Sequence, residues 1–308
     1  MRATGIPRTG LDNPRNHALR STGVVALENA RMREFSGTVR PAEASDHAAF
    51  AALFPELGVP DPVPDQARFV REIVPTALFA LQGSETVGYG HFRVLGETAH
   101  VVHLITTPSA RRTGVGSAVM KEIARRAAAR GCTSWYLNTF PSNHAAIALY
   151  TALGFAQTSR SQALKMPWAV VERTNGALAA NDALVVRRFD ASEDTGIESA
   201  CGLIRGQLAS LRALDGRILM VLLRGSAVGG FACFDPTFPG IYPFRVTTPD
   251  LGWPLLASLR PHARPTDELA IVVVENQPSV ADELLAAGGM PHLTTVRMSA
   301  PLAATAAT

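Results

Sequence analysis

The sequence predicts a mixed α/β protein made of two consecutive units, each built on a mixed sheet with helices. From residue 38 onward, segments with strand-like alternation are interleaved with segments of helical periodicity. Around residues 101–130, a strand-like segment is followed by a glycine-bearing turn and an amphipathic helix. The order of segments in the first half also recurs in the second half, which indicates an internal repeat.

Composition indicates a soluble protein that is large enough for two domains. The chain has 308 residues, of which 47% are apolar and 18% are charged. No apolar run approaches the roughly 18–20 residues of a membrane span, and no secretory signal precedes the first strand. Cys132, Cys201 and Cys233 lie far apart, without metal-ligand spacing. We therefore expect a cytoplasmic protein with no metal and no membrane contact.

Charge is concentrated at the N-terminus. Residues 1–39 hold six arginines and three acidic residues, which accounts for the whole net charge of +3. The remainder is neutral overall, so charge does not favour a nucleic-acid partner. We expect residues 1–36 to form a mostly disordered tail. Translation could instead begin at Met32, and an Arg-rich targeting peptide is the alternative interpretation of the tail.

Periodicity and turn residues divide the rest of the chain. We place the first unit at residues 37–168, a linker at 169–183, the second unit at 184–300 and a short tail at 301–308. The first unit is predicted to contain strands at 38–40, 77–82, 87–95, 101–106, 134–138 and 157–166. Its predicted helices are 46–53, 66–73, 114–130 and 143–153.

Three short matches carry the repeat. They pair Arg40–Ser45 with Arg187–Ser192, Leu78–Ser84 with Leu219–Ser226, and Thr106-Thr107-Pro108 with Thr247-Thr248-Pro249. Each match is weak alone, but their constant order favours duplication.

The turn before the helix at 114–130 has the character of an anion site. Gly114 and Gly116 permit unusual backbone angles and a close approach to a ligand. The start of the helix adds unpaired N–H groups and a positive dipole end. An ordinary strand-to-helix turn is the alternative, and two glycines alone would not exclude it.

Two motifs make the pattern more specific. Arg111-x-x-Gly114-x-Gly116 resembles the acyl-CoA signature of the GNAT acetyltransferase superfamily. Asn143-His-Ala-Ala-Ile-Ala-Leu-Tyr150-Thr-Ala-Leu-Gly-Phe155 resembles the second motif of that family. The resemblance covers roughly residues 37–168 and implies two tandem GNAT-like acyl-CoA N-acyltransferase folds, with acetyl-CoA as cosubstrate.

The resemblance also implies a set of site residues. The pantetheine would lie along a splayed strand, and the turn would take the pyrophosphate. The implied cofactor-binding residues are Leu104, Ile105, Thr106, Arg111, Arg112, Thr113, Gly114, Val115, Gly116, Ser117 and Asn143. Tyr150 would lie near the thioester sulfur, where a phenol can protonate the leaving thiolate.

The base that deprotonates the amine is less defined. We name His91, with His103, Glu97 or a water relay as alternatives. His91 stands where relatives often place a carboxylate, so the base in this chain departs from the family pattern. His100 and His103 are three residues apart on a predicted strand, which puts them on opposite faces and argues against shared metal ligation.

The second unit lacks these features. Asp250–Leu255 holds neither the arginine nor the paired glycines, and Pro254 removes a backbone donor. Aligned at Gly289, Leu285 takes the position of Tyr150. We expect a degenerate copy without cofactor that helps to shape the acceptor site. Residues 54–70 should border that site. Glu56 in this segment is expected to be a solvated loop carboxylate, and attraction of a cationic amine is the alternative.

These observations predict an acetyl-CoA-dependent N-acetyltransferase. It would transfer acetyl to a primary amine of a small molecule by direct attack in a ternary complex, as a monomer or homodimer. One alternative is a non-catalytic acyl-CoA sensor, favoured by the missing carboxylate. Another is an acyltransferase of the mycothiol-synthase type, although that family keeps its active unit at the C-terminus.

Overall fold

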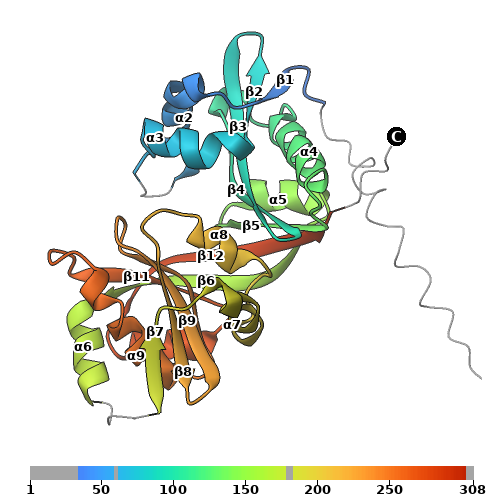
Figure 1. Cartoon of the computed structure of the whole chain (residues 1–308). Coiled ribbons are helices and arrows are strands. Elements are labelled where there is room, and N and C mark those ends of the chain that lie inside the picture. Colours follow the sequence, from blue (N-terminus) through green and yellow to red (C-terminus); the bar gives the residue numbers. More distant parts are fainter. Residues whose placement is uncertain (1–33, 59–61, 178–182, 303–308) are drawn as a thin grey trace, which may run out of the picture.

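The computed structural model describes residues 34–58, 62–177 and 183–302. The predicted tails at 1–36 and 301–308 lie almost wholly outside these residues. Twelve strands of the described chain form one mixed sheet in the order β1-β2-β3-β4-β5-β12-β6-β11-β10-β9-β8-β7 (Figure 1). No helix in the described parts is long and apolar enough to cross a bilayer.

The strands are β1 (Thr38–Pro41), β2 (Ala77–Gln82), β3 (Glu85–Leu95), β4 (Thr98–Thr106), β5 (Ser134–Thr139), β6 (Ala156–Pro167), β7 (Leu184–Arg187), β8 (Ile218–Arg224), β9 (Ala227–Asp235), β10 (Gly240–Val246), β11 (Leu269–Glu275) and β12 (Met290–Pro301). The helices are α2 (His47–Leu53), α3 (Gln66–Arg68), α4 (Val115–Ala128), α5 (His144–Ala152), α6 (Trp168–Ala177), α7 (Asp194–Cys201), α8 (Gln207–Arg212), α9 (Gly252–Ala257) and α10 (Pro278–Ala286). Short helical turns are η2 (Ala44–Asp46), η3 (Phe54–Leu57), η4 (Phe69–Ile73), η5 (Val74–Thr76), η6 (Pro108–Ala110), η7 (Ala191–Glu193), η8 (Pro249–Leu251) and η9 (Arg260–His262).

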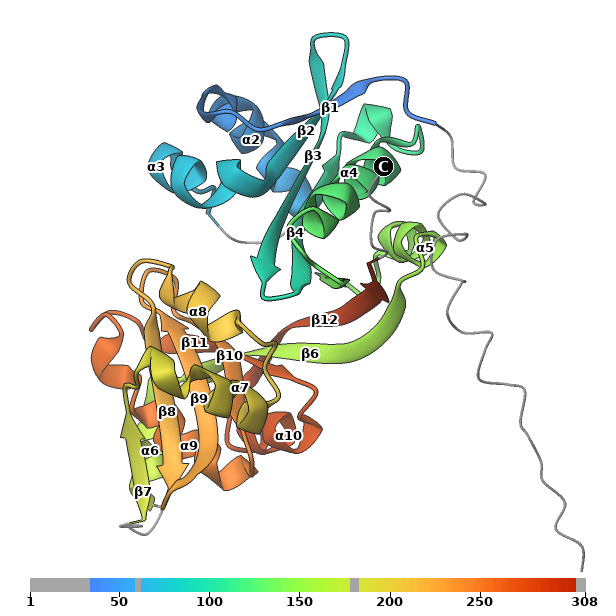
Figure 2. The same cartoon turned by 45° about the vertical axis from the view of Figure 1, so that its right-hand side comes forward.

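The two halves exchange their last strands. β12, the final strand of the chain, lies between β5 and β6 and is antiparallel to both. β6 in turn pairs with β11 of the second half. Both long strands run through the middle of the molecule in Figures 1 and 2. The strand predicted at 157–166 therefore leads into the second half, while the end of the chain completes the first.

The sheet has a helix layer on each face. On one face of the first half, α4 and α5 pack over a core that includes Val119, Met120 and Ile123. On the opposite face, α2 and the turns that follow it cover a smaller core around Phe50 and Phe69.

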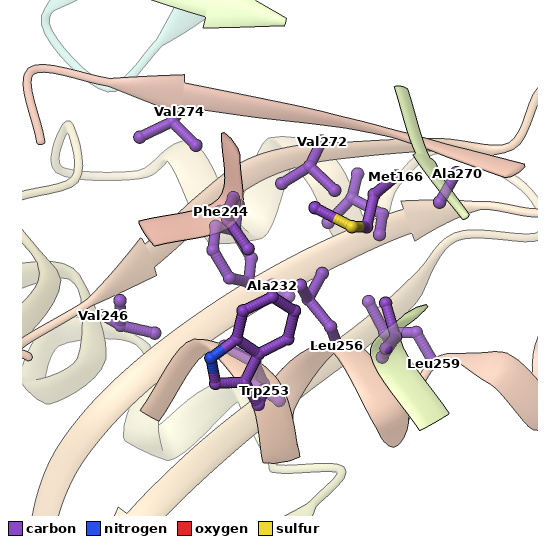
Figure 3. Packing of buried hydrophobic residues seen from close by; sticks show 14 of the residues in the cluster. Met166, Ala232, Phe244, Val246, Trp253, Leu256, Leu259, Ala270, Val272 and Val274 are labelled. Carbon is purple, nitrogen blue, oxygen red and sulfur yellow. The ribbon is translucent and has the colours of Figure 1, made fainter. Parts of the chain in front are cut away.

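The second half repeats this arrangement. Its larger core lies between the sheet and α6, α9 and α10, where Phe244, Trp253 and Val272 are almost fully buried (Figure 3). Its smaller core, around Leu208 and Phe231, lies under α7 and α8.

The same local hydrogen bonds recur in the two halves. The Arg40 guanidinium binds both oxygens of Asp46, and that of Arg187 binds both oxygens of Glu193 six residues on. Each acidic residue also accepts from the backbone N–H three residues before it, which closes a capping box. The structure thus repeats the motif that the sequence match at residues 40 and 187 indicated.

Most predicted elements agree with the structure to within a few residues. The predicted helix at 66–73 begins as α3 and continues as the π-helical turn η4. Residues 168–177, within or beside the expected linker, form α6, whose Trp168 and Val171 are buried in the larger core. Part of that segment is therefore packed structure rather than a simple connection.

Candidate active site

Two parallel strands separate in the middle of the first half. β4 and β5 pair only from Thr98–Ser134 to Val101–Leu137. β4 continues to Thr106, while the far part of β5 pairs with β12. Within the described chain, residues 103–106 of β4 therefore have a sheet partner only on the β3 side. Their other edge is free to pair with an extended ligand, as a peptide pairs in β-augmentation.

A bulge at Val102 marks the point of separation. His91 of β3 lies opposite His103, but the next residue, Phe92, lies opposite Val101. The extra residue in β4 reverses the alternation of its side chains. His100 and His103 therefore share one face of the sheet, and the prediction that they lie on opposite faces was wrong. No three metal-ligating side chains come together among the described residues.

The glycine-bearing turn follows directly on β4. It is closed by a 2.7 Å hydrogen bond from the Thr113 hydroxyl to the Ala110 carbonyl. Gly114 adopts φ 94°, a left-handed conformation that favours glycine, and Arg112 also has a positive φ of 66°. The intrahelical bonds of α4 begin with the Ala118 N–H donating to Gly114. Among the described residues, the N–H groups of residues 115–117 thus have no backbone acceptor, and they lie at the positive end of the helix dipole.

Glycines set how closely α4 approaches the sheet. A Cβ on Gly88 would lie 2.5 Å from Val115 Cγ1, and one on Gly90 would lie 2.4 Å from Val119 Cγ1. Larger residues on β3 would push the helix, and with it the turn, away from β4. A Cβ on Gly116 would lie 3.1 Å from Leu149 Cδ2. The sequence match singled out Gly116, but no local signal indicated Gly88 and Gly90.

Arg111 points out from the turn and makes an ion pair. Its Nη2 lies 2.7 Å from Glu56 Oε2 in η3. Both side chains are substantially exposed, so this pair contributes little stability and can be exchanged for another anion. The structure thus brings Arg111 together with a residue from the predicted acceptor-border segment.

The second motif places Asn143 and Tyr150 at opposite ends of α5. The Asn143 side-chain oxygen accepts from the Ala146 N–H at 3.1 Å and caps the helix. Tyr150 is 7% exposed and packs in the core with Phe155. Burial raises the pKa of its phenol to about 12, so the hydroxyl stays protonated over the neutral range.

On the opposite face of β3 and β4 lie two buried polar side chains, His91 and Tyr89, and the partly buried His103. Neither ring nitrogen of His91 has a hydrogen-bond partner among the described residues, and the same holds for His103 Nδ1 and the Tyr89 hydroxyl. The two imidazole rings are 5.6 Å apart. Burial lowers the pKa of His103 to about 4 and holds that of His91 well below its ordinary value, so both rings are neutral at pH 7.

Sequence reasoning named both histidines but missed Tyr89. Its alternation with His91 on one strand was the available signal, because residues two apart on a strand share a face. His91 is only 1% exposed, whereas His103 is partly exposed. Of the two rings, His103 lies nearer to solvent.

In the second half, the place that corresponds to the gap between β4 and β5 is at the end of β10. A side chain of this protein occupies it. The Gln277 side-chain amide donates to the Val246 carbonyl at 2.5 Å, and its oxygen accepts from the Val246 N–H at 3.4 Å. Gln277 precedes α10 as Asn143 precedes α5. Val246, the last residue of β10, thus has both its backbone N–H and its carbonyl paired with the Gln277 side chain. Pro254, which lacks a backbone donor, lies within α9.

The structure also shows which residue of the second half is equivalent to Tyr150. The Phe155 N–H donates to the Tyr150 carbonyl, and the Gly289 N–H donates to the Leu284 carbonyl in the same way. Leu284 therefore takes the place of Tyr150, and the assignment of Leu285 was off by one residue. The cause is that the left-handed glycine that ends α10 is Gly288, not Gly289.

The first half thus brings together a splayed strand pair, a glycine turn and a helix N-terminus. Residues 45–155 match the family model of the acetyltransferase (GNAT) family. The chain therefore carries a GNAT acetyltransferase domain, as the motifs predicted.

Two relatives and one solved structure are similar to this chain. An aminoglycoside N(6')-acetyltransferase type 1 from Klebsiella aerogenes is 26% identical over 43% of this chain and 97% of its own length. A thialysine N-epsilon-acetyltransferase from Mus musculus is 31% identical over 30% of this chain, a match that spans 57% of the mouse enzyme. A tandem GNAT protein from the clavulanic acid biosynthesis pathway superposes with a TM-score of 0.57 at 17% identity, covering 88% of this chain and 100% of the other. The tandem fold is thus shared with a solved structure.

Proposed function

We propose that this protein transfers acetyl from acetyl-CoA to a primary amine of a small molecule, by direct attack in a ternary complex. The observation that carries the proposal is the early end of the β4–β5 pairing, which leaves one edge of β4 free immediately before the glycine turn. The two named relatives acetylate amino groups, which supports the same class of acceptor.

The cosubstrate would be held mainly by backbone groups. Residues 104–106 would pair with the pantetheine amides, and the N–H groups of residues 115–117 would bind the pyrophosphate. Arg111 would exchange Glu56 for a phosphate, because a doubly charged group is the stronger partner. Asn143, which caps α5, would lie beside the pantetheine.

We propose that His103 accepts the amine proton and that His91 supports it from behind. His103 is neutral at pH 7 and partly exposed, so it has a free lone pair that an acceptor can reach. His91 is too deeply buried to touch the acceptor and is better suited to position a water or the neighbouring ring. A pKa of about 4 makes His103 a weak base, so a bound water relay is part of this proposal.

Tyr150 would serve as a hydrogen-bond donor to the leaving sulfur. A free thiol has an ordinary pKa of about 8.5, so complete proton transfer to its thiolate from a phenol of pKa about 12 would be uphill by roughly 5 kcal/mol. A hydrogen bond avoids that cost and still stabilises charge that develops on sulfur. A backbone N–H of β4 would stabilise the oxyanion on the other side of the reacting carbon.

The second half would act as a cofactor-free partner that shapes the acceptor site. The Gln277 side chain already hydrogen-bonds the Val246 backbone at the place where a second pantetheine would bind. The Ser210 hydroxyl in α8 donates to the Val94 carbonyl of β3, so the second half contacts the strand that carries His91. Residues 54–70 would form the opposite border of the site.

The test combines cosubstrate binding and turnover. Titration calorimetry should show one acetyl-CoA site per chain, and thiol release should appear with at least one member of a primary-amine panel. Two sites per chain would contradict the cofactor-free second half. Saturable binding without turnover on any amine would instead favour the acyl-CoA sensor.

A further inference from the structure

A polar cavity of about 350 Å³ lies where the two halves meet. Its lining includes Thr98 of β4 and Tyr136 of β5 from the first half, together with Arg245 of β10 from the second. The exchanged strands contribute Thr158 and Arg297. Because the lining residues come from both halves, neither half forms the cavity alone.

The cavity carries a surplus of buried positive charge. Among the described residues that line it, only Arg245, Glu275 and Arg297 are charged. Glu275 Oε2 lies 2.5 Å from Arg245 Nη2, and Oε1 lies 2.7 Å from Arg297 Nη2. All three side chains are largely buried, with 13%, 3% and 16% exposure respectively. Two guanidinium groups thus share one carboxylate, and one positive charge remains uncompensated.

Arg297 keeps a donor without a partner. Its Nε is buried and has no hydrogen-bond acceptor among the described residues. Its guanidinium stacks on the Tyr136 ring at 4.2 Å and also donates to the Tyr242 hydroxyl. Because this Nε is closed even to water, a ligand in the cavity would contact the 16% of the Arg297 side chain that stays exposed. The stacking holds the planar group in one orientation, which suits recognition of a planar anion.

The charge balance favours a monoanion. A carboxylate would neutralise the single surplus charge and accept from the guanidinium, whereas a phosphate dianion would overcompensate it. Hydroxyl groups complete the surroundings, since Thr98 pairs with Ser134 at 2.9 Å and Thr158 with Ser299 at 3.0 Å. Each pair can rotate a hydroxyl toward an anion without breaking a backbone bond.

The cavity and the proposed reaction centre lie on the same face of the sheet. Tyr136, at the cavity, stacks on His100 with ring centroids 4.3 Å apart. His100 and His103 share a face because of the bulge at Val102. His103 is three positions along β4 from His100, a distance of roughly 10 Å. Neither histidine lines the cavity, so a molecule anchored at Arg297 would have to extend along β4 past His100 to reach His103.

We propose that this cavity binds the carboxylate of the acceptor, so that the substrate is an ω-amino carboxylate with its amine directed at His103. Arg297 contacts the carboxylate, and Arg245 supplies the second positive charge while it holds Glu275. This inference rests on the proposed acetyl transfer and narrows its substrate class.

The kinetic test compares two acceptors that differ only in charge. The full-length protein should acetylate 6-aminohexanoate with a kcat/KM roughly tenfold to a hundredfold above that for 6-aminohexanamide. Arg297→Gln should reduce this ratio to about one, mainly through KM. Arg187→Gln, which breaks the ion pair to Glu193 elsewhere in the second half, should leave the ratio unchanged.

Two substitutions with opposite effects separate ligand binding from a structural ion pair. Glu275→Gln removes the competing carboxylate and should tighten binding of hexanoate, measured by calorimetry. Arg297→Gln should weaken it. If the cluster only stabilised the fold, both variants would lower the melting temperature and neither would change hexanoate binding.

The outcomes also separate this inference from the proposed function. Equal rates on the acid and the amide, with turnover intact, overturn the carboxylate pocket and leave the acetyltransferase standing. Absence of turnover on every amine counts against the proposed function, and hexanoate binding then decides the pocket alone. If neither Arg297→Gln nor Glu275→Gln changes hexanoate binding, the carboxylate pocket is overturned.

Discussion

Arg111 in the glycine turn is bound to Glu56 in η3 through a 2.7 Å ion pair that joins the proposed phosphate site to the proposed acceptor border. Glu56→Gln should free Arg111 and tighten CoA binding severalfold at low salt, because an exposed pair contributes only about 0–1 kcal/mol. Arg111→Gln should weaken binding. Calorimetry at two ionic strengths tests both, and a shift in the same direction for the two variants would contradict the exchange.

Gly114→Glu should abolish measurable CoA binding, a loss of roughly a hundredfold or more. The carboxylate would repel the phosphates, and the side chain would fill the approach to the helix N-terminus. Gly131→Glu is the matched control, because Gly131 also has a left-handed φ, of 81°, but lies just beyond the far end of α4. Both variants carry backbone strain of about 1–2 kcal/mol, so only a difference in affinity reports on the turn.

Tyr150→Phe should lower kcat by about tenfold to a hundredfold and leave the Kd for CoA unchanged, because only the hydrogen bond to sulfur is lost. Burial raises the pKa of Tyr150 to about 12, so its ionisation should not lower the rate of the wild-type enzyme between pH 7 and 10. An unchanged kcat in Tyr150→Phe would remove Tyr150 from the mechanism.

Tyr89→Phe removes a hydroxyl that has no partner among the described residues and should not destabilise the protein.

Acid should destabilise the protein before its carboxylates titrate. Burial lowers the pKa of His100 to about 3 and that of His103 to about 4, and it lowers the pKa of His91 as well. These rings are neutral when folded but take up protons near pH 6.5 when unfolded, so the free energy of unfolding falls as pH drops below 6.5. The three groups together give a slope of about 4 kcal/mol per pH unit near pH 5.

Urea titrations between pH 5 and 7 measure this slope. His91→Leu should reduce the slope by about one third. The variant should therefore lose less stability than the wild-type protein between pH 7 and pH 5. His144→Gln, at an exposed position that begins α5, serves as the control and should leave the slope unchanged. A wild-type protein whose stability is flat over this range would show that the histidines are not buried in neutral form.

The strand exchange predicts that the first half does not fold without the end of the chain. A fragment ending at residue 168 would lose the partner of β5 and three buried side chains of the first core, Met298, Ala300 and Leu302. That loss is on the order of 5–10 kcal/mol, comparable with the whole stability of a domain. Circular dichroism of this fragment should show no cooperative unfolding transition.

A cut between α6 and β7 provides the control for that fragment. If a protease site is placed between residues 178 and 182, the nicked chain should still elute as one species, because β6 and β12 hold the two pieces in one sheet. Separation into two folded halves on size exclusion would contradict the exchange.

The local elements were largely predictable because their signals are local. The turn at Gly114 and the cap at Asn143 depend on neighbouring residues, and both motifs could be identified by spacing alone. The bulge at Val102 could not, since it depends on the register between β3 and β4. One unseen extra residue reversed the predicted faces of His100 and His103.

The sequence by itself determined the repeated α/β plan, the acetyltransferase motifs and the loss of those motifs from the second half. Only the tertiary structure decided that β6 and β12 change places, that Gln277 closes the second gap, and that Arg297 reaches the face of the sheet that carries His103. These are contacts between residues far apart in the chain. Which strands pair depends on the free energy of the whole sheet and its cores, and hydrophobic patterns within each segment do not encode it.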